Sequence, residues 1–111
     1  MAGQIFVGDI GTEIRVQVLD ENGAVVDVSG AAVRQLKMLK PGAIAVTVKA
    51  ATDGSIQEPA KTGALGWMHY TTVLNDLDTA GEWKVQGYVE VGAWKGHTVE
   101  TRFTVFKVIG P

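Results

Sequence analysis

Few side chains in this sequence have the chemistry of an acid, a base, a nucleophile or a metal ligand. The chain contains two histidines, His69 and His97, and no cysteine. A hydrolytic triad needs a nucleophile, a base and an orienting acid within hydrogen-bond reach of one another. No Gly-x-Ser-x-Gly motif, which would mark such a nucleophile, is present. We therefore expect both histidines to be structural or surface residues and the chain to contain no catalytic residue.

Other groups of polar residues also have an ordinary structural interpretation. Glu90 and Glu100 could face each other as glycosidase carboxylates, but like charges opposite each other on a solvent face are unfavourable. The acidic turn over 20–27 lacks the spacing of a calcium loop. The glycines of segment 63–66 precede a strand, so no helix N-terminus forms a phosphate site. The sequence thus predicts no metal, no cofactor and no enzyme, with a small hydrolase kept as an alternative.

Length and charge narrow the class of protein. The 111 residues carry a net charge of −2, and 46% of them are apolar, which predicts one folded domain over 1–111. Arg34, Lys37 and Lys40 do not share a strand face, so nucleic-acid binding is not expected. No apolar run approaches the ~20 residues of a membrane span, and the first four residues lack the basic start of a signal peptide. We expect neither a membrane nor a nucleic acid as a partner.

The elements that would position these side chains are strands, because apolar and polar residues alternate along most of the chain. We expect strands over 12–19, 25–28, 31–39, 44–49, 67–73, 82–91 and 98–108. An edge strand is expected over 4–7, and a short strand near Ile56 within the long connection 52–66 stays open. Turn signals recur every ~8–12 residues, which predicts an antiparallel sandwich or barrel.

The same alternation predicts which side chains share a face of their strand. Leu36 and Met38 share one face of their strand, and Ile44, Val46 and Val48 share one face of theirs. Trp83, Val85, Val89 and Val91 are expected on the apolar face of the clearest strand. In the last strand we expect Val99, Phe103 and Val105 to point inward, and we expect a compact corner over 74–81 with at most one helical turn.

The segment Leu77–Val85 reads LDTAGEWKV and resembles the corner that leads into the penultimate strand of immunoglobulin-like domains. In those domains an aspartate and an Ala-Gly pair precede an aromatic residue of that strand. Trp83 stands here where tyrosine is usual, and the Cys…Trp…Cys signature of antibody domains is absent. The resemblance implies an all-β, Ig-like antiparallel β-sandwich of seven to eight short strands.

A second resemblance covers residues 5–108. The sequence is similar to the N-terminal domain of phage baseplate upper proteins and to small Ig-like accessory or decoration proteins encoded among phage structural genes. The matching segments are Gly8–Arg15, Leu19–Gly23, Val26–Ala31, Lys40–Gly42, which lacks the aspartate of the family's turn, Ala80–Trp83 and the hairpin Gly92–Gly96. Baseplate upper proteins continue into a stalk, whereas this sequence ends at Pro111, so a stand-alone accessory role is expected.

Four residues are candidates for an interface. Trp94 and Lys95 lie at a hairpin tip, where an aromatic side chain either anchors a partner or folds back onto its own domain. Phe6 lies in an N-terminal arm that forms an edge strand or pairs with a neighbour. Trp67 opens a strand after the 52–66 connection, which is a further candidate for contact.

These features predict a non-enzymatic structural or accessory protein of a phage virion, assembled in the host cytoplasm. It would dock on the tail, the baseplate or the capsid through protein–protein contacts. The expected partners are other virion proteins in symmetric copies, and a homo-oligomer stays open. The alternative is a carbohydrate- or cell-surface-binding module in which Trp94 and Trp67 stack on sugar rings.

Overall fold

Nine strands and one short 3-10 helix make up the regular structure in the computed structural model, which describes residues 4–109. The strands are β1 (Ile5–Phe6), β2 (Glu13–Gln17), β3 (Val33–Leu39), β4 (Thr47–Ala50), β5 (Thr52–Asp53), β6 (Trp67–Thr71), β7 (Gly81–Val91), β8 (Trp94–His97) and β9 (Thr101–Phe106), and the helix is η1 (Gly63–Leu65). No helix in this part of the chain is long and apolar enough to cross a membrane.

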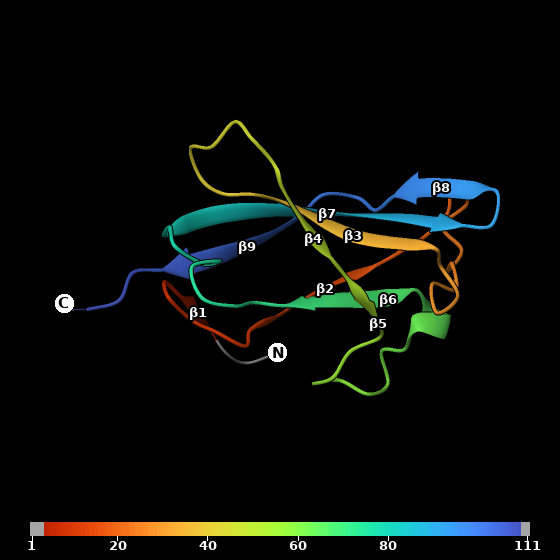
Figure 1. The fold of residues 1–111 in the computed structure, drawn as a ribbon, viewed down its shortest axis with the longest axis horizontal. Helices are drawn as coiled ribbons and strands as arrows, with labels where there is room; N and C mark the ends of the chain where they lie inside the picture. The colour runs from red at the N-terminus through yellow and green to blue at the C-terminus, as the bar shows by residue number, and fades with distance from the viewer. Residues whose placement is uncertain (1–3, 110–111) are drawn as a thin grey trace.

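The strands form two sheets that face each other (Figure 1). Sheet A has the order β1-β9-β7-β3-β4, with β8 also paired to β7, and sheet B has the order β2-β6-β5. The predicted all-β sandwich is confirmed. All strand pairs in the two sheets are antiparallel except that β1 runs parallel to β9. In chain order, β2, β5 and β6 share one sheet, and β1, β3, β4, β7, β8 and β9 share the other.

The core lies between the two sheets, where alternate residues of each strand point inward. Its buried apolar side chains are Ile14, Val16, Val18, Val28, Leu36, Met38, Met68, Leu77, Trp83, Val85, Val89 and Val105. Each fully buried side chain of this size contributes roughly 1.5–3 kcal/mol relative to its exposed state. The predicted facing of Leu36 and Met38 and of the apolar residues of β7 is confirmed, with Val91 only partly buried.

Trp83 closes the corner between β6 and β7. Its indole N–H donates to the backbone C=O of Thr79 (2.9 Å), and its ring lies 5.9 Å from that of Phe103. This bond fastens the start of β7 to the corner that precedes it. The corner contains turns and no helical turn, because Asn75 adopts a left-handed conformation with φ of 71°.

The strand expected over 98–108 begins only at Thr101, after a β-bulge that separates β8 from β9. Tyr88 lies opposite His97, whereas Val85 lies opposite Thr101, so the register shifts by one residue between β8 and β9. One extra residue exchanges the two faces of a strand. Thr98 is therefore buried, and its hydroxyl accepts the Gly87 N–H (2.8 Å). The prediction that Val99 points inward is wrong, since Val99 is 82% exposed.

The strand expected over 44–49 begins only at Thr47, and its apolar face is exposed. Ile44, Val46 and Val48 are 97%, 52% and 50% exposed. Because β3 places Leu36 and Met38 opposite Lys49 and Thr47, these two polar residues of β4 occupy the core side. Because β4 lies at the edge of the sheet, Val48 and the preceding Val46 are only half covered.

The structure decides three further segments. The segment 25–28 pairs only through a single bridge between Leu19 and Val25. No strand forms at Ile56, which lies in an exposed bend, and the strand of this connection is β5 instead. The 63–66 segment contains η1, a helix of three residues that is too short to present an anion site.

Candidate interaction surface

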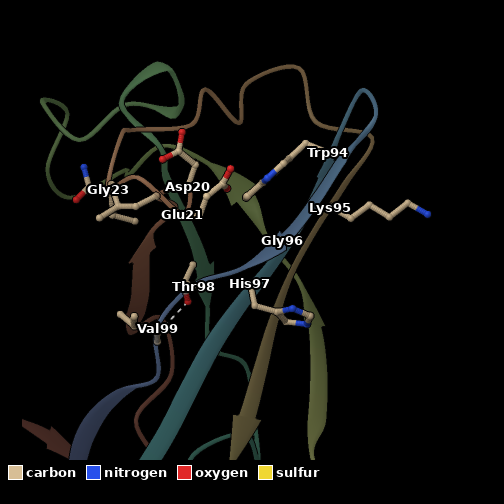
Figure 2. Close-up of a pocket in the computed structure, with 11 residues that line it drawn as sticks. Asp20, Glu21, Gly23, Trp94, Lys95, Gly96, His97, Thr98 and Val99 are labelled. Carbon is tan, nitrogen blue, oxygen red and sulfur yellow. Dashed lines mark hydrogen bonds between the residues drawn. The ribbon is translucent and has the colours of Figure 1, made fainter.

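An open groove of about 560 Å³ lies between β8 and the turn that follows β2 (Figure 2). One side is formed by Gln17, Leu19, Asp20 and Glu21, and the other by β8 with Thr98 and Val99. Figure 2 shows Asp20 and Glu21 on the turn and the Trp94 side chain reaching from β8 toward them. The groove thus combines an aromatic ring with carboxylates and an amide.

The hairpin between β7 and β8 holds Trp94 in a folded-back position. Gly92 makes the turn with a positive φ of 58°, and Trp94 lies opposite Val91. The indole lies against the backbone of Gly96, where a Cβ atom would be 2.3 Å from the ring. Trp94 is half-buried as a result and packs against the core.

Lys95 does not join Trp94 on one surface. Successive side chains of a strand point to opposite faces, and Figure 2 shows Lys95 directed away from the groove. His97 shares that outer face, where its ring lies 4.8 Å from that of Tyr88 and its Nε2 lies 3.1 Å from Lys37 Nζ. The two hairpin candidates therefore belong to two different surfaces.

The carboxylate of Asp20 holds the turn together. Its Oδ1 accepts the backbone N–H groups of Asn22 (2.9 Å) and Ala24 (3.0 Å). Glu21 is exposed at the edge of the groove. A ligand with hydroxyl groups could hydrogen-bond to these oxygens while it stacks on the indole.

Phe6 lies in an arm that is paired within its own chain. Ile5 and Phe6 pair with Val105 and Phe106 of β9, and the Phe6 N–H donates to Asp9 Oδ2 (3.0 Å). The rings of Phe6 and Phe106 lie 6.0 Å apart and are 37% and 41% exposed. The prediction of an edge strand is confirmed, and the aromatic pair remains accessible on the outer face of sheet A.

Trp67 is half-buried on the outer face of sheet B. The Nζ atom of Lys61 lies 4.2 Å from the centroid of its ring, and Lys61 also forms an ion pair with Glu58 (3.1 Å). Both partners belong to the 52–66 connection, which folds back over sheet B. This contact covers part of the ring that a sugar would need.

The most buried charged group belongs to β2 and was not expected from the sequence. Glu13 is 6% exposed, and its carboxylate accepts the Ser55 hydroxyl, the backbone N–H groups of Ile56 (3.0 Å) and Gln57 (3.3 Å), and Arg15 Nη1 (3.0 Å). The only signal in the sequence was the length and polarity of the 52–66 connection.

These contacts determine the ionisation of Glu13. Burial alone raises the pKa of a carboxyl group, but the bonds from Ser55, from the two backbone N–H groups and from Arg15 outweigh it. The pKa of Glu13 therefore lies below its ordinary value. The carboxylate stays charged and fixes the loop after β5 across β6 to β2.

The candidate acids and bases of the sequence lie apart and make structural contacts. His69 is buried, and its Nδ1 lies 2.7 Å from the C=O of Gly54. Glu90 lies opposite Lys95 in the β7–β8 register and accepts the Tyr88 hydroxyl (2.7 Å), while Glu100 bonds to Arg102. Within residues 4–109 no group of three or more His, Asp or Glu side chains is placed to hold a metal ion.

Comparison of the chain with protein-family models, with curated proteins and with solved structures found no match.

Proposed function

We propose that the protein is a non-enzymatic structural module of a phage virion that docks on the tail, the baseplate or the capsid through protein–protein contacts. The observation that carries the proposal is the placement of its apolar side chains. Among residues 4–109, more large apolar side chains are exposed than are buried. Contiguous exposed apolar surface on a small domain marks a site of contact with a partner.

Three of the exposed apolar residues lie on adjoining segments. Ile10 lies next to the end of β6 because the Gly11 N–H donates to the C=O of Thr72 (2.8 Å). Val73 and Leu74 follow directly, and the three side chains are between 54% and 70% exposed. Burial of such a patch against a neighbouring virion protein would contribute about 25 cal/mol for each Å² of apolar area.

Quantitative mass spectrometry of purified particles, with the major capsid protein as the internal standard, tests this function. Hundreds of copies of the chain per particle would place it on the capsid. A few to a few dozen copies would place it on the tail, the neck or the baseplate. Complete absence from the particles would overturn the proposal.

Variants of the patch formed by Ile10, Val73 and Leu74 test the contact itself. We expect Leu74→Asp to lower the copy number per particle, because a carboxylate cannot be buried in an apolar contact without a partner. Val99→Asp is the matched control, since Val99 is 82% exposed on a different part of the surface. Equal incorporation of both variants would exclude this patch as the docking site.

The groove at Trp94 favours a second candidate, a carbohydrate-binding function. Its indole, its carboxylates and the Gln17 amide are groups that bind sugar rings and hydroxyls. Screening of a glycan array with the protein and with Trp94→Ala tests it, and Lys95→Ala is the control because Lys95 points away from the groove. Glycan binding that Trp94→Ala removes and Lys95→Ala retains would support this function in place of the structural one.

A further inference from the structure

The strand β4 has one unpaired side at the edge of sheet A. It pairs with β3 on one side only, and no strand within residues 4–109 pairs with the other (Figure 1). Free edges attract other strands, and proteins commonly protect them with charged residues, proline or bulges. The outer side chains of β4 include none of these, since they are Val48 and Ala50, preceded by Val46.

The backbone groups that face away from β3 can be identified from the register. The Ala51 N–H donates to the C=O of Arg34 (2.9 Å), so the N–H and C=O groups of residue 51 point toward β3. Backbone groups alternate in direction along a strand. The N–H and C=O groups of Val48 and Ala50 therefore point toward the free edge.

The lysine of β4 does not protect this edge. Lys49 lies on the core side of the strand, and its Nζ forms an ion pair with Asp76 Oδ1 (3.0 Å). The same Nζ lies 5.6 Å from the centroid of the Tyr70 ring. Its charge is compensated within the chain, so it does not repel an approaching strand.

We propose that the free edge of β4 binds the β4 strand of a second copy, antiparallel and around a two-fold axis beside Val48. Val48 then lies opposite Val48 of the second copy, and the two residues exchange both backbone hydrogen bonds. On the outer face, Val46 lies opposite Ala50 of the second copy. On the core side, Thr47 lies opposite Lys49 of the second copy, so no like charges are opposed.

The self-complementary sequence of β4 favours a second copy over a different partner. A two-fold axis places a strand against its own reverse, and here apolar residues meet apolar residues along the outer face. A register shifted by one residue would place Val48 opposite a residue whose side chain belongs to the other face of the sheet. Opposite residues of an antiparallel pair share a face, so this register is excluded. Each copy contributes the free edge of its own β4 to this one contact. The contact therefore closes a dimer and does not extend into a filament.

The expected dimer is weak. A strand of four residues buries less area than the 1,200–2,000 Å² that is typical of stable interfaces. We therefore expect an association that is saturated only at high local concentration. The inference does not depend on the proposed virion function, because its tests use the purified protein.

Sedimentation velocity over a concentration series up to about 1 mM measures the association. We expect the native chain to dimerise and Val48→Lys to weaken the dimer at least tenfold, because two ammonium groups would then lie opposite each other. Val99→Lys is the matched control at an exposed position away from the edge. A native chain that stays monomeric at 1 mM, or equal dimerisation of both variants, would overturn the proposal.

A single cysteine tests the register. The native chain has no cysteine, and residues in a hydrogen-bonded antiparallel pair have Cα atoms about 5.5 Å apart, within the range of a disulfide. Val48→Cys should form a disulfide-linked dimer on mild oxidation at concentrations where Val99→Cys remains monomeric. Similar yields of disulfide-linked dimer from the two variants would exclude the two-fold pairing at Val48.

Discussion

The strands β2 and β4 both lie at an edge of their sheets and both alternate between polar and apolar residues, but their environments are opposite. In β2 the residue of the polar face, Glu13, is 6% exposed because the connection after β5 covers it. In β4 the residue of the apolar face, Val48, is 50% exposed, because no strand within residues 4–109 pairs beyond β4.

This difference shows that alternation identifies a strand without identifying its environment. The pattern states which side chains share a face. Whether that face is covered depends on segments far away in the sequence, such as Ser55 for β2. A buried carboxylate and an exposed valine are then consistent with the same local pattern, and each has its own consequence for stability or association.

The largest effect is expected from loss of the carboxylate of β2. Glu13→Ala leaves Ser55, two backbone N–H groups and part of Arg15 without their acceptor, which we expect to lower the free energy of unfolding by about 3 kcal/mol. Urea denaturation measures this value. Glu82→Ala removes an ion pair that is 55% exposed and should cost less than about 0.5 kcal/mol. If the two variants lost equal stability, the buried network would have no special role.

Acid should also lower the free energy of unfolding, by a smaller amount. The pKa values of Glu13 and Asp76 are lowered in the folded chain, because the hydrogen bonds to each carboxylate outweigh the effect of burial. Groups of this kind stabilise the fold fully above their unfolded pKa values, near 4, and this contribution is lost as the pH falls through the folded values. Thermal denaturation between pH 6 and 2 should show a shallower decline for Glu13→Gln than for the native chain, and equal slopes would contradict the assignment.

An intermediate effect is expected where β4 is attached to the rest of the fold. Lys49→Ala removes the ion pair with Asp76, whose side chain is 7% exposed, and should lower the free energy of unfolding by about 1 kcal/mol. Lys84→Ala, on the outer face of β7, is the comparison variant. An unchanged midpoint of denaturation for Lys49→Ala would mean that this ion pair does not hold β4.

The smallest effect on stability is expected from the exposed face of β4. Val48→Thr keeps the β-branched shape and should change the free energy of unfolding by less than about 0.5 kcal/mol. Urea denaturation at low protein concentration measures it. A loss above about 1 kcal/mol would show that Val48 is buried within the single chain, and the contrast with Glu13 would then disappear.

The sequence predicted the strand content and most of the core, since the buried apolar positions of β2, β3 and β7 follow the expected period of two. It also predicted the edge strand at Phe6. It failed at Val99 because a bulge of one residue between β8 and β9 exchanges the two faces of the strand. No residue type in the sequence marks the position of this bulge. The sequence left Trp94 open between an exposed and a folded-back indole, because that choice depends on the close approach of the ring to the backbone of Gly96.

The sequence by itself thus determined the type of the elements and which side chains share a face, because both follow from local backbone geometry and turn residues. Only the tertiary structure decided which faces are covered. The loop after β5 reaches Glu13 across sheet B, and β4 takes the outermost place in sheet A. Both outcomes depend on contacts between segments far apart in the chain, and such contacts leave no periodic signal in the residues that they bury or expose.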